Sequence, residues 1–152
     1  CTANGVPVLI DMAYFGMCHD IEIDLTHKCI EEVTFSLGKT FPIIGARAGI
    51  RLQKKQVDDA VLFANQHGII NNFGALIGLT CVESWTSDYI VAKYKQSQLT
   101  VCNALNVKPS KCIIFATSEE ELWAPLNRGN KSSRLCIAKD IEIEYDYTTD
   151  ND

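Results

Sequence analysis

The sequence shows no long hydrophobic run and no pattern that marks export. No apolar stretch approaches the ~20 residues that a membrane-spanning helix needs, and no charged-then-apolar segment stands at its start. The chain has 152 residues, of which 47% are apolar and 22% charged. This is the length of one domain and the composition of a globular protein that buries a core. We therefore expect a cytoplasmic protein that does not associate with membranes.

The sequence also lacks an excess of basic residues. All 14 Lys and Arg residues and 13 of the 19 acids precede residue 140, so residues 1–139 carry a net charge of about +1. The other six acids lie in residues 140–152 and bring the total to -5. Proteins that bind nucleic acid present a basic patch or stripe to the phosphates. The sequence therefore predicts no nucleic-acid partner.

The seven cysteines include no C-x-x-C pair, and their number is odd. Most stand among apolar residues, as Cys81 does between Thr80 and Val82, so we expect buried thiols in a reducing compartment rather than disulfides or zinc ligands. His19 and His27 flank an acidic loop, but no further ligands follow at a suitable spacing. The sequence therefore predicts no metal site.

Short apolar runs and helical periodicity predict an α/β fold. Strands separated by connections of crossover length are typical of a parallel sheet, and Asn71 or Asn72 can cap a helix. From Ser118, a capping box predicts a short helix, and the alternation over 141–147 predicts an edge strand in the acidic tail. The remaining expected elements are strands at 6–10, 32–35, 48–52, 111–116 and 134–138, and helices at 57–66, 71–85 and 88–105.

Five side chains suited to chemistry stand near the ends of the first three predicted strands. In open parallel sheets, ligands bind at the edge where the strands end. Taken singly, each residue has an ordinary explanation as a helix cap, a turn former or a solvated cation. Together they would bring a carboxylate, a phenol, a hydroxyl, an amine and a guanidinium to one sheet edge. These residues are Asp11, Tyr14, Ser36, Lys39 and Arg47.

These groups match the needs of a pyridoxal phosphate site. An amine that can lose its proton condenses with the aldehyde, and nearby positive charge helps it to do so. A carboxylate facing the pyridine nitrogen keeps it protonated, so that the ring accepts electrons from the substrate. A phenol can donate to the ring oxygen, and a hydroxyl with a bidentate guanidinium suits the phosphate.

Two segments carry a family resemblance. VLIDMAY at residues 8–14 resembles the D-x-A-Y element of fold-type I pyridoxal phosphate-dependent aminotransferases, and residues 36–49 resemble their S-x-x-K…G-x-R-x-G element. A tyrosine three residues after the aspartate separates the chain from the acyl-CoA-condensing branch, which has histidine there. The resemblance implies a role for each residue: Lys39 as Schiff-base lysine and proton carrier, Asp11 on the pyridine nitrogen, Tyr14 on the ring oxygen, and Ser36 and Arg47 on the phosphate.

The resemblance is weaker for the substrate and the dimer interface. Residues 133–138 resemble the segment whose arginine holds the substrate α-carboxylate, which implies Arg134 in this role, with Arg128 as the alternative. Asn71 and Asn72 fall where these enzymes present a loop to the active site across a dimer interface. Helix capping explains the two asparagines equally well.

The resemblance implies that the chain is the C-terminal half of such an enzyme. Residues 1–56 would be the C-terminal part of the large parallel-sheet cofactor domain, 57–105 a helical connector, and 106–152 a small α+β domain with an acidic tail. Family members are well over twice this length, and the phosphate-binding glycine turn of their N-terminal half is absent here. We therefore expect a fragment, a degenerate relative or a chain that needs a partner, whether a missing N-terminal half or a second copy in a homodimer.

The function predicted is transamination between an amino acid and a 2-oxo acid, with pyridoxal 5′-phosphate bound to Lys39 as a Schiff base. Lyases, decarboxylases and racemases of the superfamily share this lysine, so the choice of reaction stays open. The alternative is a non-catalytic module of the same fold. As a third reading, Ser36-x-x-Lys39 also matches the nucleophile signature of penicillin-interacting serine acyltransferases, but the companion S-D-N and K-T-G motifs are absent.

Overall fold

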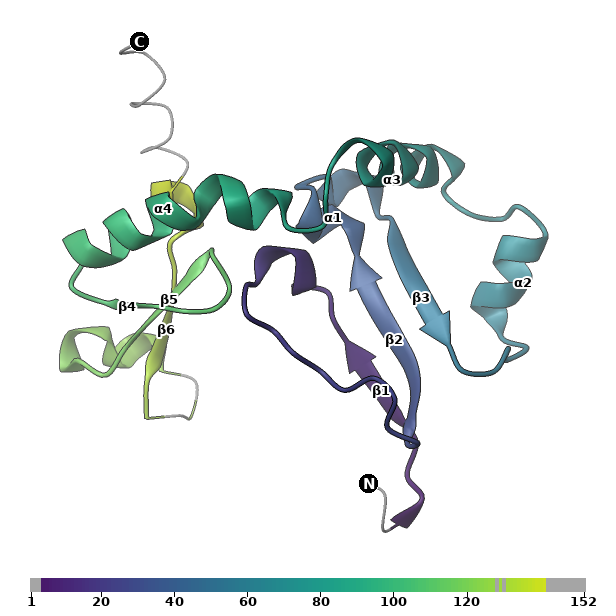
Figure 1. The fold of residues 1–152 in the computed structure, drawn as a ribbon, viewed down its shortest axis with the longest axis horizontal. Coiled ribbons are helices and arrows are strands. Elements are labelled where there is room, and N and C mark those ends of the chain that lie inside the picture. The colour runs from purple at the N-terminus through teal and green to yellow at the C-terminus, as the bar shows by residue number, and fades with distance from the viewer. Residues whose placement is uncertain (1–3, 128, 130, 142–152) are drawn as a thin grey trace. The chain divides into compact units, whose positions relative to one another are not determined.

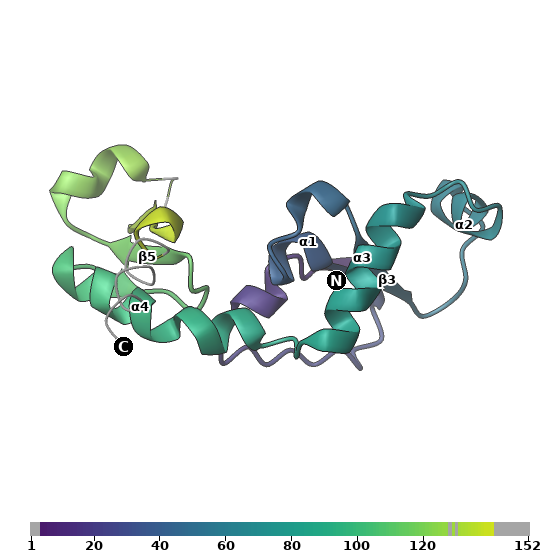
Figure 2. The ribbon, with the colours of Figure 1, turned by 90° about the horizontal axis from the view of Figure 1, so that it is seen from above.

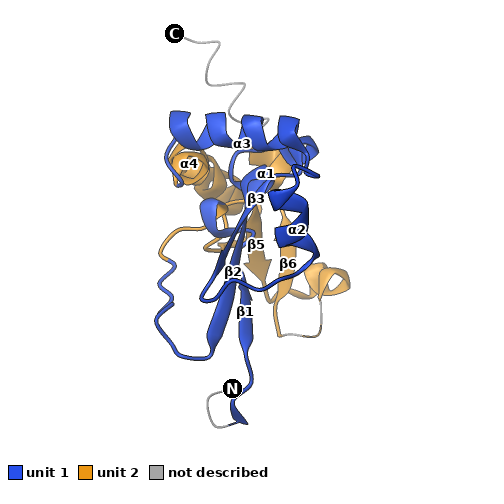
Figure 3. Ribbon diagram, turned by 90° about the vertical axis from the view of Figure 1, so that its right-hand side faces the viewer, with its two compact units in different colours: residues 1–16, 21–87 blue, residues 17–20, 88–152 orange. Residues whose placement is uncertain are grey.

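The computed structural model describes residues 4–127, 129 and 131–141 (Figure 1). The chain divides into two compact units (Figure 3). Unit 1 comprises Cys1–Gly16 and Ile21–Ser87, and unit 2 comprises Met17–Asp20 and Asp88–Asp152. Each unit contains one three-stranded sheet. The chain therefore leaves unit 1 after Gly16, contributes four residues to unit 2, and then returns.

Unit 1 is built on a mixed sheet in the order β1-β2-β3. β1 pairs with β2 in parallel, and β2 pairs with β3 in antiparallel orientation. The 3₁₀ turn η2 (Phe15–Met17) follows β1 and ends at the first residue of unit 2. The other elements are β1 (Val8–Asp11), β2 (Ile30–Ser36), α1 (Leu37–Thr40), the 3₁₀ turn η3 (Ile44–Ala46), β3 (Gly49–Gln53), α2 (Ala60–Gln66) and α3 (Asn72–Ser84).

The predicted fold class, the C-terminal part of a large parallel-sheet cofactor domain, is wrong. The described residues form two small three-stranded sheets, and the fold is mixed α/β. The apolar runs mark the positions of the first three strands, but not their directions. Between β2 and β3, residues 37–48 contain only α1 and η3 and turn the chain back along β2. A parallel neighbour would need a crossover connection, usually a helix. α1 has only four residues and η3 three, so β3 returns in the opposite direction to β2.

The core of unit 1 lies on the sheet, and α3 packs across one end of it. Met12, Ile30 and Val33 are buried together. α3 lies against η3 and the start of β3 (Figures 1 and 2). It approaches so closely that a Cβ on Gly74 would collide with the carbonyl oxygen of Ala46. Glycine at this position therefore lets α3 approach η3.

Unit 2 is an antiparallel sheet in the order β4-β5-β6, with α4 lying along it (Figure 2). Its elements are α4 (Tyr89–Ala104), β4 (Lys108–Pro109), β5 (Phe115–Ser118), the 3₁₀ helix η4 (Glu121–Leu126) and β6 (Ser133–Cys136). The core joins the helix to the strands and is formed by Cys102, Val107, Ala116, Leu135, Ile137 and Ile141.

The segment before β5 is held by a buried glutamine. Gln98 on α4 is 1% exposed, and its Nε2 donates to the carbonyl oxygens of Ser110, Cys112 and Phe115 at 3.0, 3.1 and 3.0 Å. Residues 110–114 therefore form a turn under α4, and β5 begins at Phe115 rather than at the predicted Lys111. The helix predicted from Ser118 begins at Glu121 and is 3₁₀.

Two predictions fall on residues that the structure does not describe. Arg128 lies outside the described residues, and so does the acidic tail from Glu142 onward. Ile141, the first residue of the predicted edge strand, is helical and buried in the core of unit 2. Among the described helices, none combines the length and the apolar character required to cross a membrane.

Candidate functional site

The register of the sheet in unit 1 brings the ends of three strands together. Asp11 ends β1 opposite Thr34, and β2 continues to Ser36. Ser36 pairs in turn with Gly49, the first residue of β3. The carboxyl ends of β1 and β2 and the amino end of β3 therefore share one edge. Arg47 precedes β3 by two residues at this edge.

Tyr14 and Lys39 meet beyond the strand ends. The Nζ of Lys39 lies 3.9 Å from the centre of the Tyr14 ring, a distance typical of a cation–π contact. Lys39 stands in α1, which begins directly after β2. Tyr14 follows a turn in which the Asp11 Oδ1 accepts a hydrogen bond from the Ala13 amide at 2.8 Å. The Asp11 carboxylate therefore stabilises the turn that positions Tyr14.

A hydroxyl, an amine and a guanidinium line one cavity at this edge. The cavity has a volume of about 310 Å³, and Ser36, Lys39 and Arg47 are its polar side chains. Its walls also include residues to which the sequence analysis gave no role: Phe35, Gly38, Ile44, Ala48 and Gly49. A Cβ on Gly49 would lie 2.7 Å from the carbonyl oxygen of Phe35. The second glycine of the G-x-R-x-G spacing is thus required by close packing of β2 and β3, which the spacing alone does not reveal.

Arg47 is held in place by its neighbours on η3. Its backbone is left-handed, with φ 51° and ψ 41°, an uncommon conformation for a residue with a side chain. The preceding carbonyl, that of Ala46, accepts a hydrogen bond from Asn71 Nδ2 at 2.8 Å. Asn71 also caps α3, since its Oδ1 accepts from the Gly74 amide at 2.9 Å. One asparagine side chain therefore joins α3 to the turn that carries Arg47.

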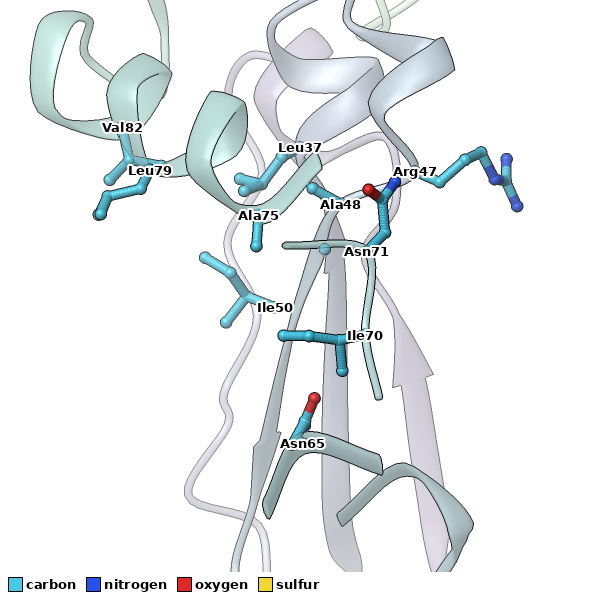
Figure 4. A pocket seen from close by; sticks show the side chains of 11 residues that line it. Leu37, Arg47, Ala48, Ile50, Asn65, Ile70, Asn71, Ala75, Leu79 and Val82 are labelled. Carbon is cyan, nitrogen blue, oxygen red and sulfur yellow. The ribbon is translucent and has the colours of Figure 1, made fainter. Parts of the chain in front are cut away.

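A second, apolar cavity of about 420 Å³ lies beside the first, between α3 and β3 (Figure 4). Arg47, Ala48 and Gly49 belong to both cavities. In Figure 4 the guanidinium of Arg47 points away from the apolar side chains of this second cavity. Those side chains are Leu37, Ala48, Ile50, Ile70, Ala75, Leu79 and Val82.

The lining of the first cavity contains two cations, Lys39 and Arg47, and no carboxylate. Within the described part of the chain, neither Lys39 nor Arg47 forms an ion pair with a carboxylate, and Ser36 makes no capping hydrogen bond to α1. Two cations and a hydroxyl on one cavity are a donor set for an anion such as a phosphate. No group of three or more His, Cys, Asp or Glu side chains among the described residues could hold a metal ion.

Five of the predicted residues do not line the first cavity: Asp11, Tyr14, Asn71, Asn72 and Arg134. Asp11 lies at the same edge, but the cavity wall does not include its side chain. Asn72 is the exposed first residue of α3. Arg134 belongs to unit 2, where it lies on β6 opposite Thr117, with its guanidinium 4.6 Å from the centre of the Phe115 ring.

No model of a protein family, no curated protein and no solved structure matches the chain. The resemblance to aminotransferases therefore depends on the short motifs at residues 8–14, 36–49 and 133–138.

Proposed function

We propose that the chain binds pyridoxal 5′-phosphate at the cavity of unit 1 and takes part in transamination between an amino acid and a 2-oxo acid. The observation that supports this most strongly is the shared cavity of Ser36, Lys39 and Arg47, with the Tyr14 ring against the Lys39 amine. These groups come from three segments: the β2–α1 junction, the residue after η3 and the turn after β1. Together they suit the phosphate, the aldehyde and the ring oxygen of the cofactor.

The donor set fits the cofactor by its chemistry. Ser36 and Arg47 would hold the phosphate, because a guanidinium and a hydroxyl donate hydrogen bonds to its oxygens. Asp11 would hold the pyridine nitrogen, and Tyr14 the ring oxygen. When bound, pyridoxal phosphate supplies an aldehyde that combines with amines and a ring that accepts electrons from the substrate.

Lys39 is the group that would transfer the proton of the substrate's α-carbon. An amine beside the substrate can take the proton from the substrate's α-carbon as a general base and then deliver it to a second carbon as a general acid, which is the proton shift that transamination needs. The Tyr14 ring under the ammonium group limits the positions that this amine can occupy. In this proposal the reaction would take place in the cytoplasm.

A second chain belongs to this proposal. α3 leaves large apolar side chains exposed, including Phe73 at 74% and Leu76 at 61%. Contiguous exposed apolar surface of this kind is typical of an interface. The partner would be a second copy or a chain that supplies an N-terminal half. Sedimentation equilibrium of the purified chain tests for self-association, which Phe73→Asp should weaken.

The test of the proposed activity is a single turnover. The chain is loaded with pyridoxal phosphate, L-amino acids are added one at a time, and the 2-oxo acid formed is measured against the free cofactor alone. We expect at least one amino acid to react faster on the chain than with the free cofactor, and the Lys39→Ala variant to show only the free-cofactor rate. Cofactor binding without any turnover would instead favour the non-catalytic module.

The serine acyl-enzyme reading can be tested separately. Ser36 stands directly before the one-turn helix α1 without a capping hydrogen bond to it, and Lys39 lies in that turn, the order that a Ser-x-x-Lys nucleophile requires. However, no hydrogen bond between these two side chains occurs in the described part of the chain, and the Lys39 amine lies over Tyr14. If mass spectrometry found a penicillin attached to Ser36, it would overturn the transamination proposal.

A further inference from the structure

Two cysteines that are distant in the sequence face each other in unit 2. Cys18 and Cys112 form an isolated antiparallel β-bridge. Both are partly exposed, and both thiols are free. Cys18 belongs to Met17–Asp20, the short segment by which the N-terminal part of the chain joins unit 2.

The backbone hydrogen bonds define the geometry of this pair. The amide of His19 donates to the carbonyl of Lys111 at 3.0 Å, and the amide of Ile113 donates to the carbonyl of Met17 at 2.9 Å. Bonds made by the flanking residues place Cys18 opposite Cys112 as a non-hydrogen-bonded pair, in which the Cα atoms are about 4.5 Å apart. A disulfide spans Cα separations of about 4.4–6.8 Å. The two thiols can therefore be joined with little movement of the backbone.

Further contacts hold the two segments in this register. Lys111 Nζ donates to the carbonyl of Asp20 at 2.7 Å, and the Cys112 carbonyl accepts from both Gln98 Nε2 and Ser110 Oγ. The turn that carries Cys112 is thus fixed to α4, and the residues around Cys18 are fixed to that turn. Side-chain hydrogen bonds to main-chain carbonyls therefore support the bridge on both sides.

We propose that Cys18 and Cys112 form a modification site, which a low-molecular-weight disulfide such as glutathione disulfide converts to an intramolecular disulfide. The Cys18 thiolate attacks one sulfur of glutathione disulfide, breaks its S–S bond and releases one glutathione thiolate, which takes up a proton. Cys112 then loses its proton and attacks the Cys18 sulfur, which releases the second glutathione. The protein loses two electrons and two protons, and the oxidant gains both.

The reaction should be slow at neutral pH, because it needs a thiolate. Burial raises the pKa of Cys18, although a hydrogen bond with Cys112 acts in the opposite direction. Burial and the neighbouring Cys18 raise the pKa of Cys112 to about 12, while the positive charge of Arg134 lowers it. The charged and titratable residues next to the pair along the chain are His19 and Lys111. We therefore expect oxidation to become faster as the pH rises above neutral.

The experiment is peptide mapping of the full chain after incubation with glutathione disulfide, with and without later reduction. We expect the main product to be a peptide pair joined through Cys18 and Cys112, formed faster at higher pH and reversed by dithiothreitol. Cys136→Ser, which removes an exposed thiol on β6, should leave this product unchanged.

Cys18→Ser should abolish the product and leave Cys112 unmodified or joined to glutathione. The wild-type map tests the proposal even if this variant does not fold. Stable glutathione adducts on Cys18 without the crosslink would overturn the proposal, and so would disulfides distributed among other cysteine pairs. Oxidised wild type should also unfold at a higher temperature than reduced wild type, because the bond closes a long loop in the unfolded chain.

Discussion

The contact between Lys39 and Tyr14 shows what single residues contribute to the proposed site. The two residues lie after different strands, and their side chains meet because β1 and β2 end at the same edge. Asp11 has a structural part in this arrangement, since its carboxylate accepts the Ala13 amide. A change at Asp11 would therefore disturb the turn before Tyr14 as well as any ligand that its carboxylate holds.

Replacement of Arg47 should separate phosphate binding from the rest of cofactor recognition. We expect Arg47→Gln to weaken pyridoxal phosphate binding by about 10- to 100-fold, the loss of a charge-assisted hydrogen bond worth about 1.5–3 kcal/mol. Pyridoxal, which lacks the phosphate, serves as the matched ligand. If titration shows that both ligands are weakened equally, Arg47 does not act on the phosphate.

Asp59 should make folding stability depend on pH. The Arg51 guanidinium donates to Asp59 at 2.8 and 3.1 Å, the amides of Leu62 and Val61 also donate to it, and its pKa falls to about 2. Because the unfolded value is about 3.9, this stabilisation is present above about pH 4 and is lost as the pH falls towards about 2.

Thermal midpoints of wild type and Asp59→Asn across that pH range test this expectation. The wild type should be more stable at neutral pH, and the difference should shrink with acidification, since asparagine keeps the cap but carries no charge. Asp58→Asn is the control, because Asp58 is exposed and does not contact Arg51 in the structure. A difference between wild type and Asp59→Asn that stays constant with pH would contradict this account.

Among the secondary-structure elements, α3 depends on glycine where it meets η3. Gly74→Ala should destabilise unit 1 by about 1–3 kcal/mol, although alanine favours helices, because its Cβ would collide with the Ala46 carbonyl. Gly45→Ala is the matched control, since a Cβ there meets nothing within 4 Å. Urea denaturation measures both variants. If both variants lowered the free energy of unfolding equally, the close packing of α3 at Gly74 would not explain the loss of stability.

Shortening the Gln98 side chain should weaken the attachment of residues 110–115 to α4 and so destabilise the protein. Gln98→Ala removes a donor shared by three carbonyl oxygens. Those of Cys112 and Phe115 keep a hydrogen bond from Ser110, so we expect a loss of about 1–3 kcal/mol, mainly from the part-buried Ser110 carbonyl. Gln96→Ala, at an exposed position of the same helix, should change stability by less than about 0.5 kcal/mol. The urea midpoints of the two variants provide the comparison, and equal midpoints would argue against this role for Gln98.

Elements with local signals could be predicted from the sequence. Asn71 as a cap predicts the start of α3, and apolar spacing predicts α4, because both signals act within a few residues. β5 starts later than its apolar run suggests, because Gln98 holds residues 110–114 in a turn. That contact joins residues far apart in the sequence, and no local pattern reports it.

For the whole molecule, the sequence predicted neither the direction of β3 nor the pairing of Met17–Asp20 with unit 2. The direction of β3 follows from how α1 and η3 turn the chain, and Met17–Asp20 joins unit 2 through pairing with Lys111 and Ile113. Both depend on tertiary contacts. The sequence shows which types of side chain stand near the strand ends. Only the structure shows that Asp11 lies outside the cavity and that Asn71 both caps α3 and binds the Ala46 carbonyl.

The central claim is that Lys39 is the amine that holds pyridoxal phosphate, and covalent trapping tests it most directly. The full chain is mixed with an equal concentration of pyridoxal phosphate, reduced with borohydride and mapped by mass spectrometry. We predict the phosphopyridoxyl group on Lys39 in preference to exposed Lys54 and Lys55, and its loss from that peptide in Lys39→Ala. Labelling spread evenly over the three lysines, or absent from Lys39, would contradict the account.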